Sequence, residues 1–143
     1  DPYAYHRLQA WHCFDIGAEA THFWAFGDTG GANSWNEYLG TKHSYTPLFL
    51  GAKSVTPGRH MEALRESVED YEYMVMLRDR IAQLQRTNPA HPRLPEARSL
   101  LAKAPGRVLH GASASELRWQ QARDRSVADI VRIEIGTMLE SLR

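Results

Sequence analysis

A stretch near the N-terminus gathers side chains that can hold a sugar. Residues 22–38 read HFWAFGDTGGANSWNEY and combine aromatic rings with carboxylates around a glycine-rich turn. Aromatic rings pack on the apolar faces of sugars, while carboxylates and amides hydrogen-bond to sugar hydroxyls. We therefore take Trp24, Asp28, Trp35 and Tyr38 as candidate carbohydrate contacts. The structural alternative makes Trp24 a core residue and Asp28 the cap of a turn.

Hydrolysis would require two carboxyl groups in addition to these contacts. A glycosidase places its two carboxyl groups roughly 5–10 Å apart. Asp28 and Glu37 are the candidates within this stretch, but a hydrogen-bonding role for Asp28 toward sugar hydroxyls is favoured. The GDTGGA segment at 27–32 lacks the Gly-Lys-Ser/Thr ending of a phosphate-binding loop. We therefore interpret it as a loop over a pocket.

The seven histidines form no recognisable metal-binding pattern. The sequence holds no His-x-His, no HExxH and no cysteine cluster. His60 and Glu62 are two positions apart and so do not share a helix face. We expect no metal and no cofactor. His60, at the start of a long predicted helix, is instead a candidate to reach the sugar pocket.

Composition narrows the class of protein. The 143 residues carry 17 basic and 17 acidic side chains, so the formal net charge is zero. A dedicated nucleic-acid surface would usually show a basic excess. The sequence has no run of about 18 apolar residues that could span a membrane. The single Cys13 excludes an internal disulfide.

The candidate contacts must be positioned by helices and strands. Apolar periodicity predicts helices over 3–18, 58–86, 95–104 and 115–142. Short apolar runs at 20–26 and 45–51 predict two strands. Helices and strands alternate through residue 86, which indicates parallel strands joined by helical crossovers. Two strands do not make a stable sheet alone, so either they pair with polypeptide outside this chain or the chain contains further strands.

The predicted helix 58–86 carries both an apolar stripe and many charges. Arg65 and Glu69 are four positions apart and can form an ion pair. The charged residues around them are interpreted as a solvated face with structural ion pairs. The predicted core stripe consists of Met61, Leu64, Val68, Tyr71, Val75 and Ile81. The apolar stripe of the last helix is interpreted as core or as an interface with the remainder of the barrel; it consists of Val127, Ile130, Val131, Ile135, Met138, Leu139 and Leu142.

The segment GRHMEALRESVEDYEYMVMLRDRI (58–81) resembles the R-x-E-x-L-R-E-G-x-x-D-Y-E-Y helix of glycoside hydrolase family 123 and its relatives, the domain of unknown function 4091. An upstream R-x-x-x-W helix (Arg7, Trp11) and the closing helix ADIVRIEIGTMLESL fit the same family. The likeness covers nearly all of the chain. His60 stands where the family usually has Arg, and Ser67 where it usually has Gly.

The resemblance implies a fold and a chemistry. The family is a (β/α)₈ barrel that hydrolyses N-acetylhexosaminides, with the acetamido group of the substrate as nucleophile. Its catalytic pair is an adjacent Asp-Glu at the end of a middle strand. No Asp-Glu dipeptide occurs in this sequence. The catalytic residues would therefore lie outside this chain, or this relative lacks them.

We accordingly expect the C-terminal portion of a (β/α)₈ TIM-type barrel with additional C-terminal helices. Residues 1–86 would supply the last strands and helices, and residues 87–143 a helical extension. The expected partners are a carbohydrate and the remainder of the barrel. A secreted or periplasmic location follows if the resemblance holds. The alternatives are a non-catalytic carbohydrate-binding protein and a helical interaction module whose apolar stripes dock a partner.

Overall fold

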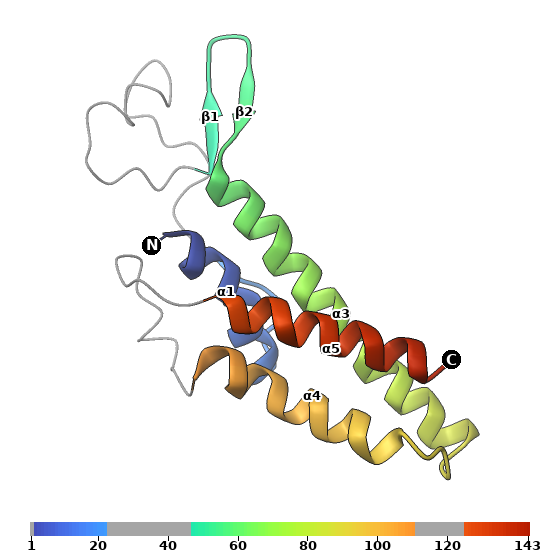
Figure 1. The fold of residues 1–143 in the computed structure, drawn as a ribbon. Helices are drawn as coiled ribbons and strands as arrows, with labels where there is room; N and C mark the ends of the chain where they lie inside the picture. Colours follow the sequence, from blue (N-terminus) through green and yellow to red (C-terminus); the bar gives the residue numbers. More distant parts are fainter. Residues whose placement is uncertain (1, 23–46, 111–124) are drawn as a thin grey trace.

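The computed structural model describes residues 2–22, 47–110 and 125–143. In chain order, the elements are α1 (Pro2–Ile16), β1 (Leu48–Leu50), β2 (Val55–Pro57), α3 (Arg59–Thr87), α4 (Leu94–Leu109) and α5 (Ser126–Ser141). Figure 1 shows the four helices packed together, with the β1–β2 hairpin projecting beyond the first turn of α3. Among the described residues, a hydrophobic cluster joins α1, α3, α4 and α5.

The prediction of a partial (β/α)₈ barrel is wrong for the described residues. They contain four helices and one two-stranded antiparallel sheet, in which Phe49 pairs with Thr56. β1 and β2 are antiparallel because the connection between them is short. A parallel crossover needs a dozen or more residues, whereas the residues at 51–54 close a hairpin. Residues 20–22, part of the expected first strand, form no strand, and 23–26 lie outside the described residues.

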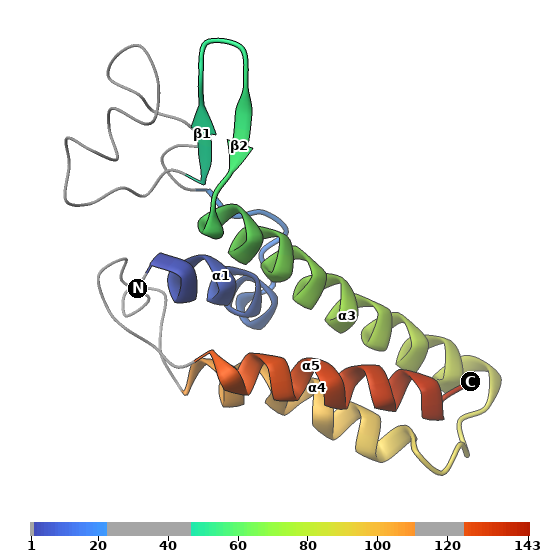
Figure 2. The same ribbon diagram turned by 45° about the horizontal axis from the view of Figure 1, so that its top comes forward.

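The hairpin is joined to α3 through Gly58. The backbone N–H of Gly58 donates to the carbonyl of Pro47 at 2.8 Å. A Cβ at this position would lie 2.9 Å from a ring carbon of Phe49, which is too close for any larger residue without a shift of the ring. Figure 2 shows the hairpin continuing away from the helices beyond the start of α3. Gly58 thus permits the abrupt change from strand to helix.

Helix α1 ends at a glycine in the left-handed conformation. Gly17 has φ 71°, and the N–H of Ala18 donates to the carbonyl of Cys13 at 2.8 Å. This bond closes the last turn and satisfies a carbonyl that the helix leaves open. The sequence predicted Gly17 as the stop of a helix over 3–18, and the structure ends the helix at Ile16.

The core-facing side of α3 differs from the predicted stripe. The buried residues are Ala63, Ser67, Asp70, Met74, Leu77, Ile81 and Leu84, and Val68 is 58% exposed. Of the predicted stripe only Ile81 belongs to this face. The apolar pattern failed because Ser67 and Asp70 are polar residues that the fold buries between helices. The apolar stripe is a second face, roughly a quarter-turn away around the helix.

Helix α4 is longer than predicted. The sequence placed its end before Pro105, yet the helix continues through Pro105 to Leu109. Proline removes one backbone donor from a helix interior. Continuation of the helix buries Val108 and Leu109, which offsets this cost. The helix ends at His110, which adopts the left-handed conformation with φ 50°.

Helix α5 completes the bundle with a narrower apolar face than predicted. Its buried residues are Ala128, Val131, Ile135 and Met138, and Leu142 is buried just beyond its end. Ile130, which was predicted to be core or part of an interface with the rest of the barrel, is 53% exposed and so is not part of this core. None of the described helices is both long enough and apolar enough to cross a membrane.

Candidate functional site

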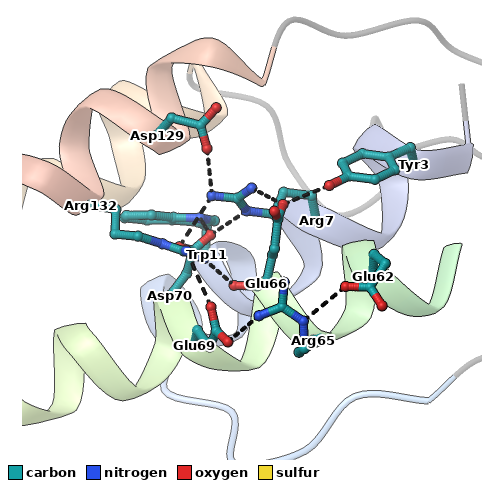
Figure 3. A network of polar contacts seen from close by, with 10 residues as sticks. All are labelled: Tyr3, Arg7, Trp11, Glu62, Arg65, Glu66, Glu69, Asp70, Asp129 and Arg132. Carbon is teal, nitrogen blue, oxygen red and sulfur yellow. Dashed lines mark hydrogen bonds and ion pairs between the residues drawn. The ribbon is translucent and has the colours of Figure 1, made fainter. Parts of the chain in front are cut away.

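A polar cluster with a buried centre joins α1, α3 and α5. Figure 3 shows that Tyr3, Arg7 and Trp11 come from α1, Glu66, Glu69 and Asp70 from α3, and Asp129 and Arg132 from α5. Side chains three or four residues apart share one face of a helix, so each helix directs its members toward the same point. The local helical spacing therefore assembles the cluster when the three helices pack.

Asp70 is the acceptor at the centre of this cluster. Its side chain is fully buried, and Oδ2 accepts hydrogen bonds from Arg7 Nε at 2.6 Å and Trp11 Nε1 at 2.8 Å. Arg132 Nε donates to the other carboxylate oxygen. These contacts satisfy a carboxylate that would otherwise be very costly to bury.

Arg7 is the matching cation. Its side chain is 1% exposed and forms ion pairs with Glu66, Asp70 and Asp129, with Nη2 lying 2.8 Å from Asp129 Oδ1. Burial opposes the charge of the guanidinium, but the hydrogen bond and charge of Asp70, together with the two other carboxylates, outweigh it. The pKa of Arg7 is therefore raised above its usual value.

Glu66 extends the cluster toward the start of α1. Its Oε2 accepts from the Tyr3 hydroxyl at 2.6 Å and from Arg7 Nη1. Burial raises the pKa of Glu66, but the Tyr3 hydrogen bond and the charges of Arg7 and Arg132 more than compensate, so the pKa lies below the usual value. The Tyr3 ring also carries the guanidinium of Arg125 over its face, 4.0 Å from the centroid.

The charges and pKa shifts of this cluster indicate a structural role and not general acid catalysis. A general acid needs a carboxyl group whose pKa is raised toward neutrality. Glu66 shows the opposite shift, and the carboxylates of Asp70 and Asp129 contact arginines. The arrangement therefore holds three helices in register. In the described part of the chain, no group of three or more His, Cys, Asp or Glu side chains is placed to hold a metal ion.

Ser67 lies at a direct backbone-to-side-chain contact between α1 and α3. It is buried, and its Oγ accepts a hydrogen bond from the backbone N–H of Ala10 at 3.1 Å. Ala63, one turn earlier on α3, is also fully buried. Small residues at these two positions let the helices approach closely. This gives a packing reason for Ser at a position where the resembled family usually has Gly.

His60 is the one predicted site residue that the structure describes. It is the second residue of α3 and is partly buried, with its ring centroid 5.7 Å from that of His6 on α1. His6 is fully buried, and burial, with a smaller contribution from His60, lowers its pKa from 6.5 to about 4. The fold thus places His60, at the start of α3, against His6 of α1, which is uncharged at neutral pH.

The other predicted sugar contacts, Trp24, Asp28, Trp35 and Tyr38, lie outside the described residues, as does Glu37. The structure does show the chain on either side of them. They fall between α1, which ends at Ile16, and β1, which begins at Leu48.

The predicted ion pair between Arg65 and Glu69 is confirmed, and Arg65 also pairs with Glu62 at 2.9 Å. The expectation of a solvated charged face is wrong for Asp70, which is buried. The sequence contained a signal for this: Arg7 and Trp11 lie one helical turn apart and share a face. That spacing alone could not identify Asp70, 59 residues beyond Trp11, as their common partner.

The chain was compared with protein-family models, with curated proteins and with solved structures, and no match was found in any of the three comparisons.

Proposed function

We propose that this chain contributes sugar contacts to a glycoside-hydrolase-like protein that acts on a glycosidic bond. The resemblance implies N-acetylhexosaminides as the substrate class. The contacts would come from Trp24, Asp28, Trp35 and Tyr38, with His60 beside them. The support for this function is the family resemblance of the sequence and the chemistry of these side chains. The catalytic acid pair is not assigned to residues of this chain.

One observation carries the proposal furthest. The two motifs on which the resemblance rests, R-x-x-x-W in α1 and D-Y-E-Y in α3, meet at one atom, because Arg7 and Trp11 both donate to Asp70 Oδ2. Two motifs 59 residues apart therefore serve one purpose in the fold. They hold together α1 and α3, the helices that precede and follow the aromatic stretch at residues 22–38. A scaffold for sugar contacts requires such a connection.

The role of the helical unit in this proposal is support. Binding groups are commonly carried on segments that a rigid framework positions. Here α1 and α3 flank the aromatic stretch in the chain and are joined by the Asp70 cluster. The cluster would then affect sugar binding only by positioning the side chains that contact the sugar.

The test is titration of the chain with N-acetylglucosamine and N-acetylgalactosamine by calorimetry. Tyr38→Ala should weaken binding, since truncation removes a stacking ring worth roughly 1 kcal/mol. Tyr73→Ala is the matched control, because Tyr73 is a partly exposed tyrosine of α3 outside the proposed contacts. Equal affinities of both variants and the parent chain, or no binding of either sugar to the parent chain, would contradict the proposal.

A further inference from the structure

The surface between α4 and α5 forms an open groove. The two helices run in opposite directions side by side (Figure 1) and pack on each other. The groove has a volume of about 470 Å³, and its lining includes Leu100, Lys103 and Arg107 of α4 and Ile133, Glu134 and Met138 of α5. It lies outside the Asp70 cluster and the predicted sugar contacts.

The floor of the groove is apolar and part of it is open to solvent. Met138 is buried at its base and Leu100 is partly buried. Ile133 is 69% exposed, the highest fraction among the exposed large hydrophobic side chains of the described residues. An exposed apolar residue in a concave site provides an anchor point for a partner.

The rim leaves one positive charge without a local partner. Arg107 pairs with Glu134 at 2.5 Å, and Arg93 pairs with Glu96 at 3.1 Å. Both carboxylates of the groove are therefore neutralised by arginines. Within the described ranges, Lys103 forms no ion pair, so the free charge at the rim is positive. A partner that supplies a carboxylate would complement it.

The shape of the groove favours a helix as the occupant. An extended strand laid on two helices would leave its backbone N–H and C=O groups without partners, whereas a helix satisfies its own. Side-chain ridges of a third helix also fit the furrow between two neighbouring helices. We propose that the α4–α5 groove binds an amphipathic acidic helix of a partner protein, with its apolar stripe on Ile133 and Leu100 and a carboxylate at Lys103.

The experiment uses the full chain and two synthetic peptides. Both have the length of α4, 16 residues, with leucines at helical spacing; one carries glutamates on its polar face and the other lysines at the same positions. Fluorescence anisotropy should show binding of the acidic peptide and at least roughly fivefold weaker binding of the basic one. Ile133→Asp should weaken binding of the acidic peptide while the circular dichroism of the chain stays unchanged.

Charge reversal decides whether Lys103 is the contact. Lys103→Glu should reverse the preference and favour the basic peptide. Lys53→Glu is the matched control, since Lys53 is an exposed residue of the distant hairpin loop and the change in net charge is identical. Failure of both peptides to bind, an unchanged preference in Lys103→Glu, or the same effect in Lys53→Glu would overturn the proposal.

Discussion

Arg7 and Asp70 lie 2.6 Å apart, and both side chains are withdrawn from solvent at the junction of α1 and α3. A buried ion pair seldom adds much net stability over apolar residues of the same size, yet it is costly to break one half of it. The importance of this pair is therefore that it fixes how α1 and α3 pack, with Arg132 bringing α5 to the same carboxylate.

Removal of the Arg7 guanidinium should destabilise the chain strongly. Arg7→Met keeps much of the side-chain volume but leaves Asp70, Glu66 and Asp129 with less compensation, at a cost of about 3 kcal/mol in the free energy of unfolding. Urea denaturation followed by circular dichroism measures this. Arg65→Met is the control, because Arg65 pairs with Glu62 and Glu69 at the exposed surface and little change is expected.

Combination of Arg7→Met with Asp70→Leu tests whether the pair acts as a unit. The double variant should lose less stability than the sum of the two single losses, by at least about 1 kcal/mol, because each single change leaves the other charge buried and poorly compensated. Strictly additive losses would show that the two side chains stabilise the fold independently.

The presence of the helices was predictable from sequence, although α4 runs beyond its predicted end to Leu109, and the polar core was not predictable. The apolar periodicity predicted a helix over 58–86, and α3 spans Arg59–Thr87, a difference of one residue at each end. The prediction succeeded because helix periodicity is a local property of the sequence. The face that α3 buries depends on partners far along the chain. Ser67 and Asp70 are buried only because Ala10, Arg7 and Trp11 reach them from α1.

The strands failed for a different reason. Residues 48–50 do form a strand within the predicted run 45–51, but its partner is 55–57, where no strand was predicted. Three-residue strands give almost no periodic signal, and Pro57 discourages a strand assignment. The four predicted sugar contacts at Trp24, Asp28, Trp35 and Tyr38 stay predictions from residue type, while His60 is placed at the start of α3.

Ser67 offers a test of helix packing. Ser67→Leu would force α1 and α3 apart at the point where the Ala10 N–H meets the Ser67 hydroxyl, and overpacking of this kind costs about 1–3 kcal/mol. Thermal unfolding should show a lower midpoint. Val68→Leu adds one methylene at the neighbouring position, which is 58% exposed, and should leave the midpoint nearly unchanged. A midpoint for Ser67→Leu equal to that of Val68→Leu would contradict the close approach of the two helices.

The chain should lose stability in mild acid through His6. Its pKa is about 4 in the folded state and 6.5 in the unfolded state, so the unfolded chain takes up the proton first as the pH falls. The stability that comes from keeping His6 uncharged is fully present above pH 6.5 and is lost as the pH falls toward 4. The total loss in the free energy of unfolding is on the order of 3 kcal/mol. The lowered pKa of Glu66 acts in the same direction at lower pH, because its stabilisation is lost as it protonates.

Urea denaturation at pH 7 and pH 5 measures this dependence. His6→Phe removes the titrating group from the core and should flatten the loss of stability between the two pH values. His22→Phe, at an exposed position, should retain the slope of the parent chain. An identical slope in His6→Phe would mean that His6 titrates normally and that other groups set the acid sensitivity.

The most direct measurement compares Trp35→Ala with Arg7→Met in calorimetric titrations with N-acetylglucosamine and N-acetylgalactosamine, together with urea unfolding of each variant. We predict that Trp35→Ala weakens sugar binding and leaves the unfolding midpoint unchanged, whereas Arg7→Met lowers the midpoint and the folded fraction still binds sugar. The contrary result is a Trp35→Ala chain that unfolds more easily but binds sugar as tightly as the parent. It would show that the aromatic stretch serves the fold and that the sugar site lies elsewhere.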